Sequence, residues 1–146
     1  MLEEILWKKQ LLAIIVFNQF KAAGTHFFTP DEFSQQLAYM HHPAGKRIEP
    51  HLHNPVPCTI ERTQEVLIIK RGELRVDFYN NEQQYLESRL LTDGDVILLV
   101  SGGHGFEVVS DVEMFEVKQG PYLGTQTKTC FSGVDAQRVQ LGRALA

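Results

Sequence analysis

From residue 35 onward, short apolar-rich segments alternate with clusters of turn-forming residues. The breaks are rich in Gly, Pro, Asn and Asp, and the segments span residues 36–42, 46–53, 65–70, 73–79, 85–91, 96–100, 104–109 and 113–119. Many short strands at this spacing are typical of a β-sandwich or barrel, whereas βαβ units would need helical patterns between the strands. The pattern therefore predicts an all-β, antiparallel architecture.

The longest apolar run, LLAIIVF at residues 11–17, lies before this region. It is far shorter than the ~20 residues that a membrane-spanning helix needs, and its β-branched composition predicts a buried strand. Glu3 and Glu4 make the preceding segment acidic, and no good small-residue cleavage site follows, which argues against a signal peptide. We therefore expect a cytoplasmic protein that makes no contact with a membrane.

Helical patterns occur only near the two ends of the strand-rich region. Residues 29–32 place Pro30 where a short helical turn can start, and in residues 134–145 Val134, Leu141 and Leu145 roughly share one helical face. The chain is accordingly divided into an N-terminal extension with one strand (1–34), a barrel (35–122) and a C-terminal tail (123–146). We expect the tail to be partly mobile or to dock on a partner.

Composition narrows the functional class. The 146 residues carry a formal net charge of −4, which argues against a general nucleic-acid binder because such proteins need a basic face. The two cysteines, Cys58 and Cys130, are too few for a disulfide framework and match no metal-knuckle spacing. These counts favour a soluble single domain.

Three of the six histidines are arranged in a pattern that suggests a metal site. His51 and His53 are two residues apart in a predicted strand, so their side chains point to the same face of a sheet. Glu65 begins a predicted strand whose same-face neighbours are apolar, and a carboxylate there is costly unless it is paired or bound to a metal. His104 likewise precedes apolar residues, Phe106 and Val108, on the same face of a predicted strand. Three imidazoles and one carboxylate form a common ligand set for a divalent first-row metal.

The spacing around these residues resembles the first sequence motif of the cupin superfamily. Gly45, His51, His53, Glu65 and Gly72 occupy its glycine, His-x-His, glutamate and glycine positions. The chain departs from the motif in the spacer between His53 and Glu65, which has eleven residues and is longer than the motif's spacer. The resemblance implies a small antiparallel barrel, the double-stranded β-helix or jelly roll, with this spacer as a loop at its mouth.

A second, looser match completes the ligand set that the resemblance implies. Gly94, Gly102 and His104 are similar to the second cupin motif, although Val100 stands at its proline position and the histidine comes one residue early. The implied metal ligands are His51, His53, Glu65 and His104, with Fe, Mn, Ni or Zn as the ion. Glu61, in the long spacer, is an alternative to Glu65 as the carboxylate ligand.

The wider sequence suggests a substrate class. Stretches such as GELRVDFY, GDVILLVSGGHGFEV and EVKQGPY are similar to compact bacterial cupins encoded near sugar and surface-polysaccharide genes. Arg47 shares the facing of His51, and Tyr39 and Lys118 are further candidates for catalytic groups. A basic group beside a metal suits an anionic substrate such as a sugar phosphate or a nucleotide sugar.

The same residues are compatible with more than one function. The leading hypothesis is a metal-dependent enzyme, an isomerase or epimerase or a related lyase or oxygenase. The alternatives are a non-catalytic module that binds a sugar or metabolite, and a metal-free epimerase that uses His and Tyr as acid and base. A homodimer is expected because a small barrel with an N-terminal apolar strand has free strand edges that can pair with a second chain.

Overall fold

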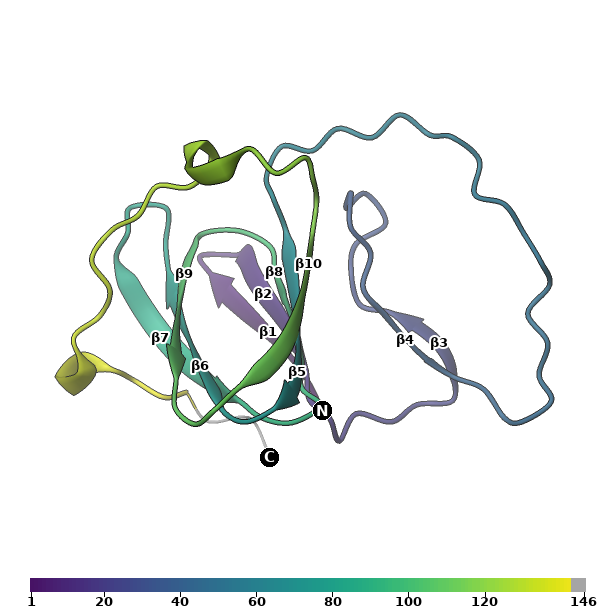
Figure 1. The fold of residues 1–146 in the computed structure, drawn as a ribbon, viewed down its shortest axis with the longest axis horizontal. Helices are drawn as coiled ribbons and strands as arrows, with labels where there is room; N and C mark the ends of the chain where they lie inside the picture. The colour runs from purple at the N-terminus through teal and green to yellow at the C-terminus, as the bar shows by residue number, and fades with distance from the viewer. Residues whose placement is uncertain (143–146) are drawn as a thin grey trace.

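The computed structural model describes residues 1–142, and this part of the chain is all-β with antiparallel sheets (Figure 1). Its strands are β1 (Leu2–Trp7), β2 (Gln10–Val16), β3 (Gly24–Phe27), β4 (Ala38–His41), β5 (Glu65–Arg71), β6 (Leu74–Tyr79), β7 (Tyr85–Leu91), β8 (Val96–Leu99), β9 (Gly103–Val108) and β10 (Glu113–Lys118). Two 3-10 helices, η1 (Gly124–Thr127) and η2 (Ala136–Arg138), follow the last strand. The all-β class expected from the sequence is therefore confirmed.

Two sheets face each other and enclose the main core. One has the strand order β1-β2-β8-β5-β10, and the other has the order β7-β6-β9. Alternate residues of both sheets point inward, as the two-residue period of a strand requires. The buried side chains between the sheets include Ala13, Ile15, Leu67, Ile69, Leu74, Val76, Phe78, Leu91, Ile97 and Leu99.

The five-stranded sheet is buried on its second face as well. There Ile14, Val66 and Leu98 form a cluster with Val16 and Val100, and the segment after β2 covers it with Phe20, Phe28, Phe33 and Leu37. Because β2 is buried on both faces, its sequence is a continuous apolar run rather than an alternating one. The strand predicted from residues 11–17 is thus confirmed as β2, and it lies between β1 and β8 in the sheet.

Several local expectations were wrong. Residues 46–53 form no strand, since the chain from residue 42 to residue 64 is a long loop. Residues 29–32 form a turn and not a helix, and the expected C-terminal helix is reduced to η2 in the described residues, with Leu145 outside them. The sequence pattern also missed β1 and β3. The β1–β2 turn uses Lys8 and Lys9 at positive φ, so it lacks the Gly or Asn that normally marks such a hairpin.

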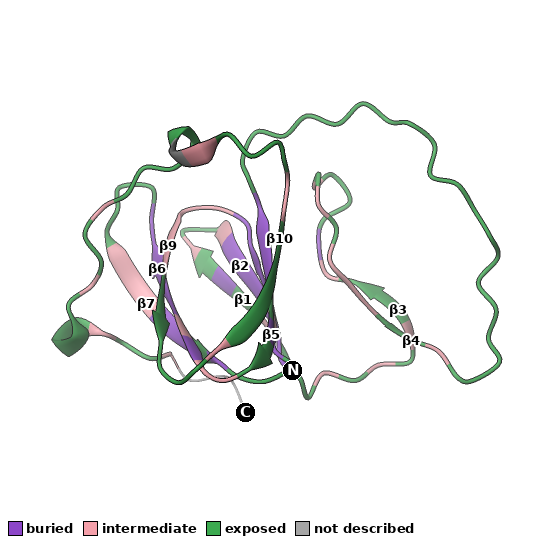
Figure 2. Ribbon diagram, in the orientation of Figure 1, coloured by how far each residue is buried: buried purple, intermediate pink, exposed green. Residues whose placement is uncertain are grey.

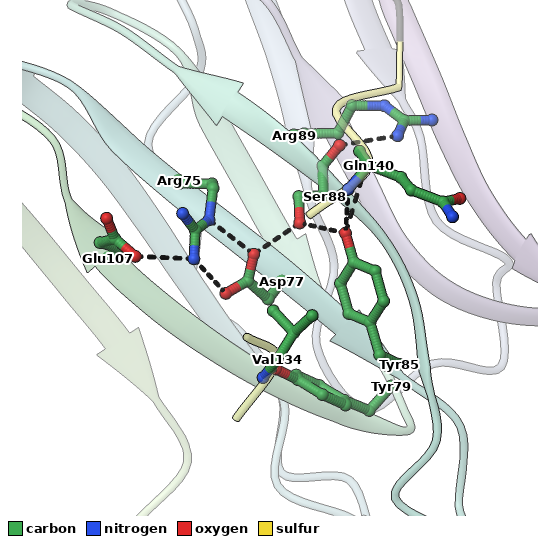
Figure 3. Close-up of polar contacts among 9 residues, drawn as sticks. All are labelled: Arg75, Asp77, Tyr79, Tyr85, Ser88, Arg89, Glu107, Val134 and Gln140. Atoms are coloured by element: carbon green, nitrogen blue, oxygen red, sulfur yellow. Dashed lines mark hydrogen bonds and ion pairs between the residues drawn. The ribbon is translucent and has the colours of Figure 1, made fainter. Parts of the chain in front are cut away.

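The C-terminal segment, expected as a mobile or partner-docking tail, packs on the outer side of the three-stranded sheet (Figure 3). The Tyr79 hydroxyl accepts a hydrogen bond from the Val134 N–H at 2.9 Å, and the Tyr85 hydroxyl accepts one from the Gln140 N–H at 2.8 Å. Backbone bonds then join Ser88 to Gln140 and Gly142, which covers the free edge of β7. This segment is therefore part of the folded body up to residue 142.

A polar network lies under this segment (Figure 3). Asp77, which is buried, accepts two hydrogen bonds from Arg75 at 2.8 and 3.0 Å and one from the Ser88 hydroxyl at 2.5 Å. Ser88 in turn contacts the Tyr85 hydroxyl at 2.7 Å, and Arg75 reaches Glu107 at 2.7 Å. Every member is paired, so the network holds β6, β7 and β9 to the C-terminal segment without an unsatisfied charge.

One side of the two-sheet body is joined and the other is open. Arg89 on β7 forms an ion pair with Glu3 on β1 at 2.8 Å, which links the two sheets at that side. On the opposite side, β9 pairs only with β6 and β10 only with β5 among the described strands. The sheets therefore do not form a closed barrel. No helix within residues 1–142 is long and apolar enough to span a bilayer.

Candidate functional site

A cavity of about 720 Å³ lies at one end of the open side. Strand residues Glu65, His104 and Lys118 line one wall, and the C-terminal segment supplies the other, including Tyr122, Lys128, Cys130 and Phe131. The start of β5 and the end of β10 meet here because the two strands are antiparallel, with Glu65 opposite Lys118. The start of β9 belongs to the other sheet, and its His104 approaches Glu65 from there. The cavity thus gathers residues from distant parts of the sequence.

Glu65 lies at the centre of this group. It is the first residue of β5 and is 8% exposed, and it points inward like Leu67 and Ile69 on the same strand. Its Oε2 lies 3.3 Å from His104 Nε2, and its Oε1 lies 3.8 Å from Lys118 Nζ. Lys118 is also paired with Glu116. The buried carboxylate expected from the sequence is therefore accompanied by two basic groups.

The electrostatics favour the ionised form of Glu65. A hydrogen bond from His104 lowers the pKa of the Glu65 carboxyl, and the charges of His104, Lys128 and Lys118 lower it further. Burial opposes them, because desolvation disfavours the carboxylate. The net effect is a Glu65 pKa below its ordinary value of 4.5.

This arrangement predicts the pH response of the metal-free protein. Because the folded-state pKa of Glu65 is lowered, its stabilising contribution is present above pH 4.5 and is lost as the pH falls through the folded-state value. Replacing His104 with Phe removes the main cause, so the Glu65 pKa should rise and the acid limb of the stability profile should move to higher pH.

Carboxyl NMR titration and urea unfolding between pH 2 and 7 measure the two effects. Glu113 provides an internal control, since its pKa is lowered by Lys70, which is outside this group. It should titrate identically in both proteins. A Glu65 pKa that does not move in His104→Phe would contradict the assigned contact.

The other two sequence-predicted ligands lie elsewhere. His51 and His53 are exposed on the loop of residues 42–64, with their ring centroids 5.2 Å apart, and His51 Nδ1 donates to the Glu49 carbonyl at 2.9 Å. In the described part of the chain, no three His, Cys, Asp or Glu side chains are grouped so that they could hold a metal ion. The fold thus brings together two of the four expected ligands.

The remaining candidates are divided between the cavity and the periphery. Lys118 lines the cavity, whereas Arg47 and Glu61 are exposed on the long loop. Tyr39 lies in β4 and packs edge-on against Phe20 at 5.1 Å between ring centroids. Sequence reasoning missed Tyr122, Lys128 and Phe131, because no periodicity marks the segment that carries them.

The cavity as it stands can bind an anion and move a proton. Lys118 and Lys128 supply positive charge, and the Glu65–His104 contact provides a carboxylate and an imidazole within hydrogen-bonding reach. Aromatic surface from Phe106, Tyr122 and Phe131 adds an apolar wall that can contact a sugar or a base.

Comparison of the chain with protein-family models, curated proteins and solved structures finds no match.

Proposed function

We propose that this protein is a metal-binding cupin that acts as an enzyme on a small anionic substrate of carbohydrate type. The observation that carries the proposal is the meeting of Glu65 and His104 in one cavity with Lys118 beside them. The first two are residues to which the cupin resemblance assigns metal binding. Isomerisation or epimerisation is the leading reaction class, with lyase or oxygenase chemistry as related possibilities.

The strand order supports a jelly roll that lacks two strands. A jelly roll has eight strands in two sheets. When the β1–β2 hairpin is counted as an N-terminal addition to the five-stranded sheet, β10-β5-β8 and β9-β6-β7 supply three strands to each sheet. The free edges of β9 and β10 belong to consecutive strands joined by residues 109–112. Residues 36–42 and 46–53 have strand patterns and are joined by a similarly short turn. The two segments could therefore add one strand to the free edge of β9 and one to the free edge of β10.

We propose an antiparallel arrangement in which residues 43–45 turn at the same end of the body as the connection between β9 and β10. All paired strands in the described chain are antiparallel. With the two short turns at the same end, residues 36–42 then pair with β10 and residues 46–53 pair with β9. The second segment ends beside the start of β9, where His104 lies, so His51 and His53 reach the same end of the body as Glu65.

The donor set then fits a divalent transition metal. Glu65 already supplies a buried carboxylate, His104 supplies an imidazole, and His51 and His53 complete an N/O set suited to Fe, Mn, Ni or Zn. These residues would hold the ion, and the chemistry it would supply is Lewis-acid polarisation of a carbonyl or hydroxyl oxygen. Lys118 and Lys128 bind the anionic group, and the aromatic wall limits access of water.

Metal content tests the proposal. Protein supplied with Fe, Mn, Ni or Zn should retain about one ion per chain after gel filtration, and His51→Ala should lose it. His26→Ala is the matched control, because His26 is an exposed histidine bonded to the Ala23 carbonyl and should leave metal content unchanged. Wild-type protein that holds less than ~0.3 ion per chain contradicts the metal function. Comparing Glu65→Gln with Glu61→Gln decides which carboxylate is the ligand.

The direct Glu65–His104 contact also favours a second candidate, a metal-free acid–base epimerase. His104 and Tyr122 line the same cavity. An imidazole and a phenol can act as base and acid without a metal ion, and Glu65 is in contact with His104. Turnover of a sugar phosphate or nucleotide sugar that persists in the presence of a chelator would favour this function. Binding without turnover, with or without metal, would instead indicate the non-catalytic module.

A further inference from the structure

We propose that a second pocket, between the β1–β2 hairpin and the β6–β7 turn, binds a neutral sugar unit. The pocket has a volume of about 320 Å³. The two turns belong to opposite sheets, so the pocket lies at one end of the space between them. Its lining consists of one aromatic ring and a set of polar side chains: Trp7, Lys8, Gln10, Asn80, Asn81, Glu82 and Gln84.

One wall of the pocket is aromatic. Trp7, the last residue of β1, packs partly against the main core and turns the rest of its side chain to the pocket. The Nζ atom of Lys8 lies 5.2 Å from the centre of the indole ring, which is a cation–π distance. Lys8 is exposed, so a bound molecule displaces it from the ring at small cost. A flat aromatic surface of this kind can pack against the C–H face of a sugar ring.

The opposite wall is a turn built around a buried asparagine. Asn80 is 3% exposed, and its amide donates to Gln84 Oε1 at 2.9 Å. Its Oδ1 accepts hydrogen bonds from the backbone N–H groups of Glu82 and Gln84 at 3.0 and 2.9 Å. The turn itself is exposed beyond the buried end of β6 (Figure 2). The backbone that carries the exposed polar groups is thus fixed before a ligand arrives, which lowers the entropy cost of binding.

Uncommon backbone conformations are concentrated around this pocket. Within residues 1–142, positive φ outside glycine occurs only at Lys8 (45°), Lys9 (71°) and Gln83 (64°). Lys8 lines the pocket, and Lys9 and Gln83 each lie between two lining residues. Such conformations are uncommon for non-glycine residues and cluster at binding and active sites. They therefore support a binding role for these two turns.

The free hydrogen-bonding groups suit hydroxyls. Gln10 Nε2 donates to Ser101 Oγ at 2.9 Å, and Gln84 Oε1 accepts from Asn80. Gln10 therefore presents an acceptor to the pocket, Gln84 presents a donor, and the exposed Asn81 amide presents both. A sugar hydroxyl can donate and accept, so it can pair with each of these groups.

The charge and size of the pocket indicate a neutral ligand. The positive charge of Lys8 is balanced by the negative charge of Glu82, so the lining has no net charge with which to attract a phosphate or an ammonium group. The volume is at the lower end of the ~300–1,000 Å³ typical of small-molecule sites. It suits one sugar unit better than a whole nucleotide sugar.

The pocket is a neighbour of the cavity but is distinct from it. Tyr79 lines the cavity, the next residue, Asn80, lines the pocket, and the two sites share no lining residue. Sugar binding in the pocket therefore requires neither a metal nor the proposed reaction. Recognition of a neighbouring unit of the same carbohydrate is the role that this position suits, and that role alone rests on the proposed function.

Fluorescence of Trp7, the only tryptophan in the chain, tests the site directly. The probes are the methyl glycosides of glucose, galactose, mannose and N-acetylglucosamine, each titrated in the presence of EDTA. At least one should give a saturable change with a Kd on the order of 1 mM, the affinity expected of so small a ligand. Glycerol at the same mass concentration should give only a linear change.

A matched pair of asparagine variants locates the binding. Asn81→Ala should weaken binding by about 3–10-fold, because it removes hydrogen bonds to the sugar from an exposed turn. Asn54→Ala is the control, since Asn54 is equally exposed but lies on the loop of residues 42–64 outside the pocket. Its Kd should equal that of wild type. Trp7 is retained in both variants, so the same signal reports on both.

Three results would overturn the proposal. One is the absence of a saturable change with all four glycosides, and another is an unchanged Kd in Asn81→Ala. The third is a saturable response to inorganic phosphate but to no glycoside, which would assign the pocket to an anion at Lys8. Because EDTA is present throughout, sugar binding by a protein that holds no metal would support the pocket while the metal function fails separately.

Discussion

Replacing Arg89 with Leu is expected to lower the free energy of unfolding by about 3–5 kcal/mol, the usual cost of removing one partner of a buried ion pair. The Arg89 guanidinium donates to Glu3 at 2.8 and 2.9 Å and to Glu87 at 2.8 Å, and its side chain is 9% exposed. Leu would leave the Glu3 carboxylate buried without a counter-charge. Because this pair joins β1 to β7, its loss also separates the two sheets at their closed side.

Urea unfolding followed by fluorescence measures the change. Lys70→Leu is the matched control, since Lys70 and Glu113 form a pair of the same 2.8 Å length with both side chains more than half exposed. Exposed pairs contribute little, so the control should unfold close to wild type. The double variant Glu3→Leu/Arg89→Leu should recover part of the loss by removing the stranded carboxylate. Equal effects of Arg89→Leu and Lys70→Leu would contradict the structural role of burial.

Replacing Gly72 with Ala should destabilise the protein by about 2–5 kcal/mol, from left-handed strain together with steric overlap. Gly72 has a φ of 93°, and a Cβ placed on it would lie 2.0 Å from the Asp111 carbonyl oxygen. That oxygen belongs to the backbone of the β9–β10 connection and cannot rotate away. Gly72 N–H also donates to the Asp93 carboxylate at 2.6 Å, so displacement of the turn would cost this bond too.

Gly45→Ala isolates the steric part of this effect. Gly45 also has positive φ, at 84°, but a Cβ added to it would meet no atom within 4 Å in the single chain. It should therefore lose only about 1–2 kcal/mol, the cost of the left-handed conformation. Thermal and urea unfolding of the two variants give the comparison. A loss at Gly45 as large as the loss at Gly72 would show that backbone strain alone accounts for both.

Local pattern was sufficient for most strands of the two sheets. β7 matches its predicted range of residues 85–91, and β5, β6, β8, β9 and β10 begin or end within one residue of theirs. These strands are bounded by Gly, Pro, Asn or Asp turns and alternate toward a single core, so the information lies within a few neighbouring residues. The pattern also placed Glu65 at the buried start of its strand.

Pairing partners and the assembly of the cavity depended on tertiary structure. Leu2–Trp7 was missed because its hairpin turn consists of two lysines, and it becomes a strand by pairing along the length of β2. Tyr122, Lys128 and Phe131 reach the cavity because a segment without periodicity is held by Tyr79 and Tyr85.

By itself, therefore, the sequence determined the all-β class, most strand ranges and the inward facing of Glu65 and His104, since these follow from a two-residue period and local turn chemistry. Tertiary structure decided that Glu65 and His104 lie 3.3 Å apart while His51 and His53 lie on an exposed loop. The physical reason is that a side chain's facing is a local property of its strand. The distance between two side chains depends on which strand edges pair, and that is settled by long-range packing.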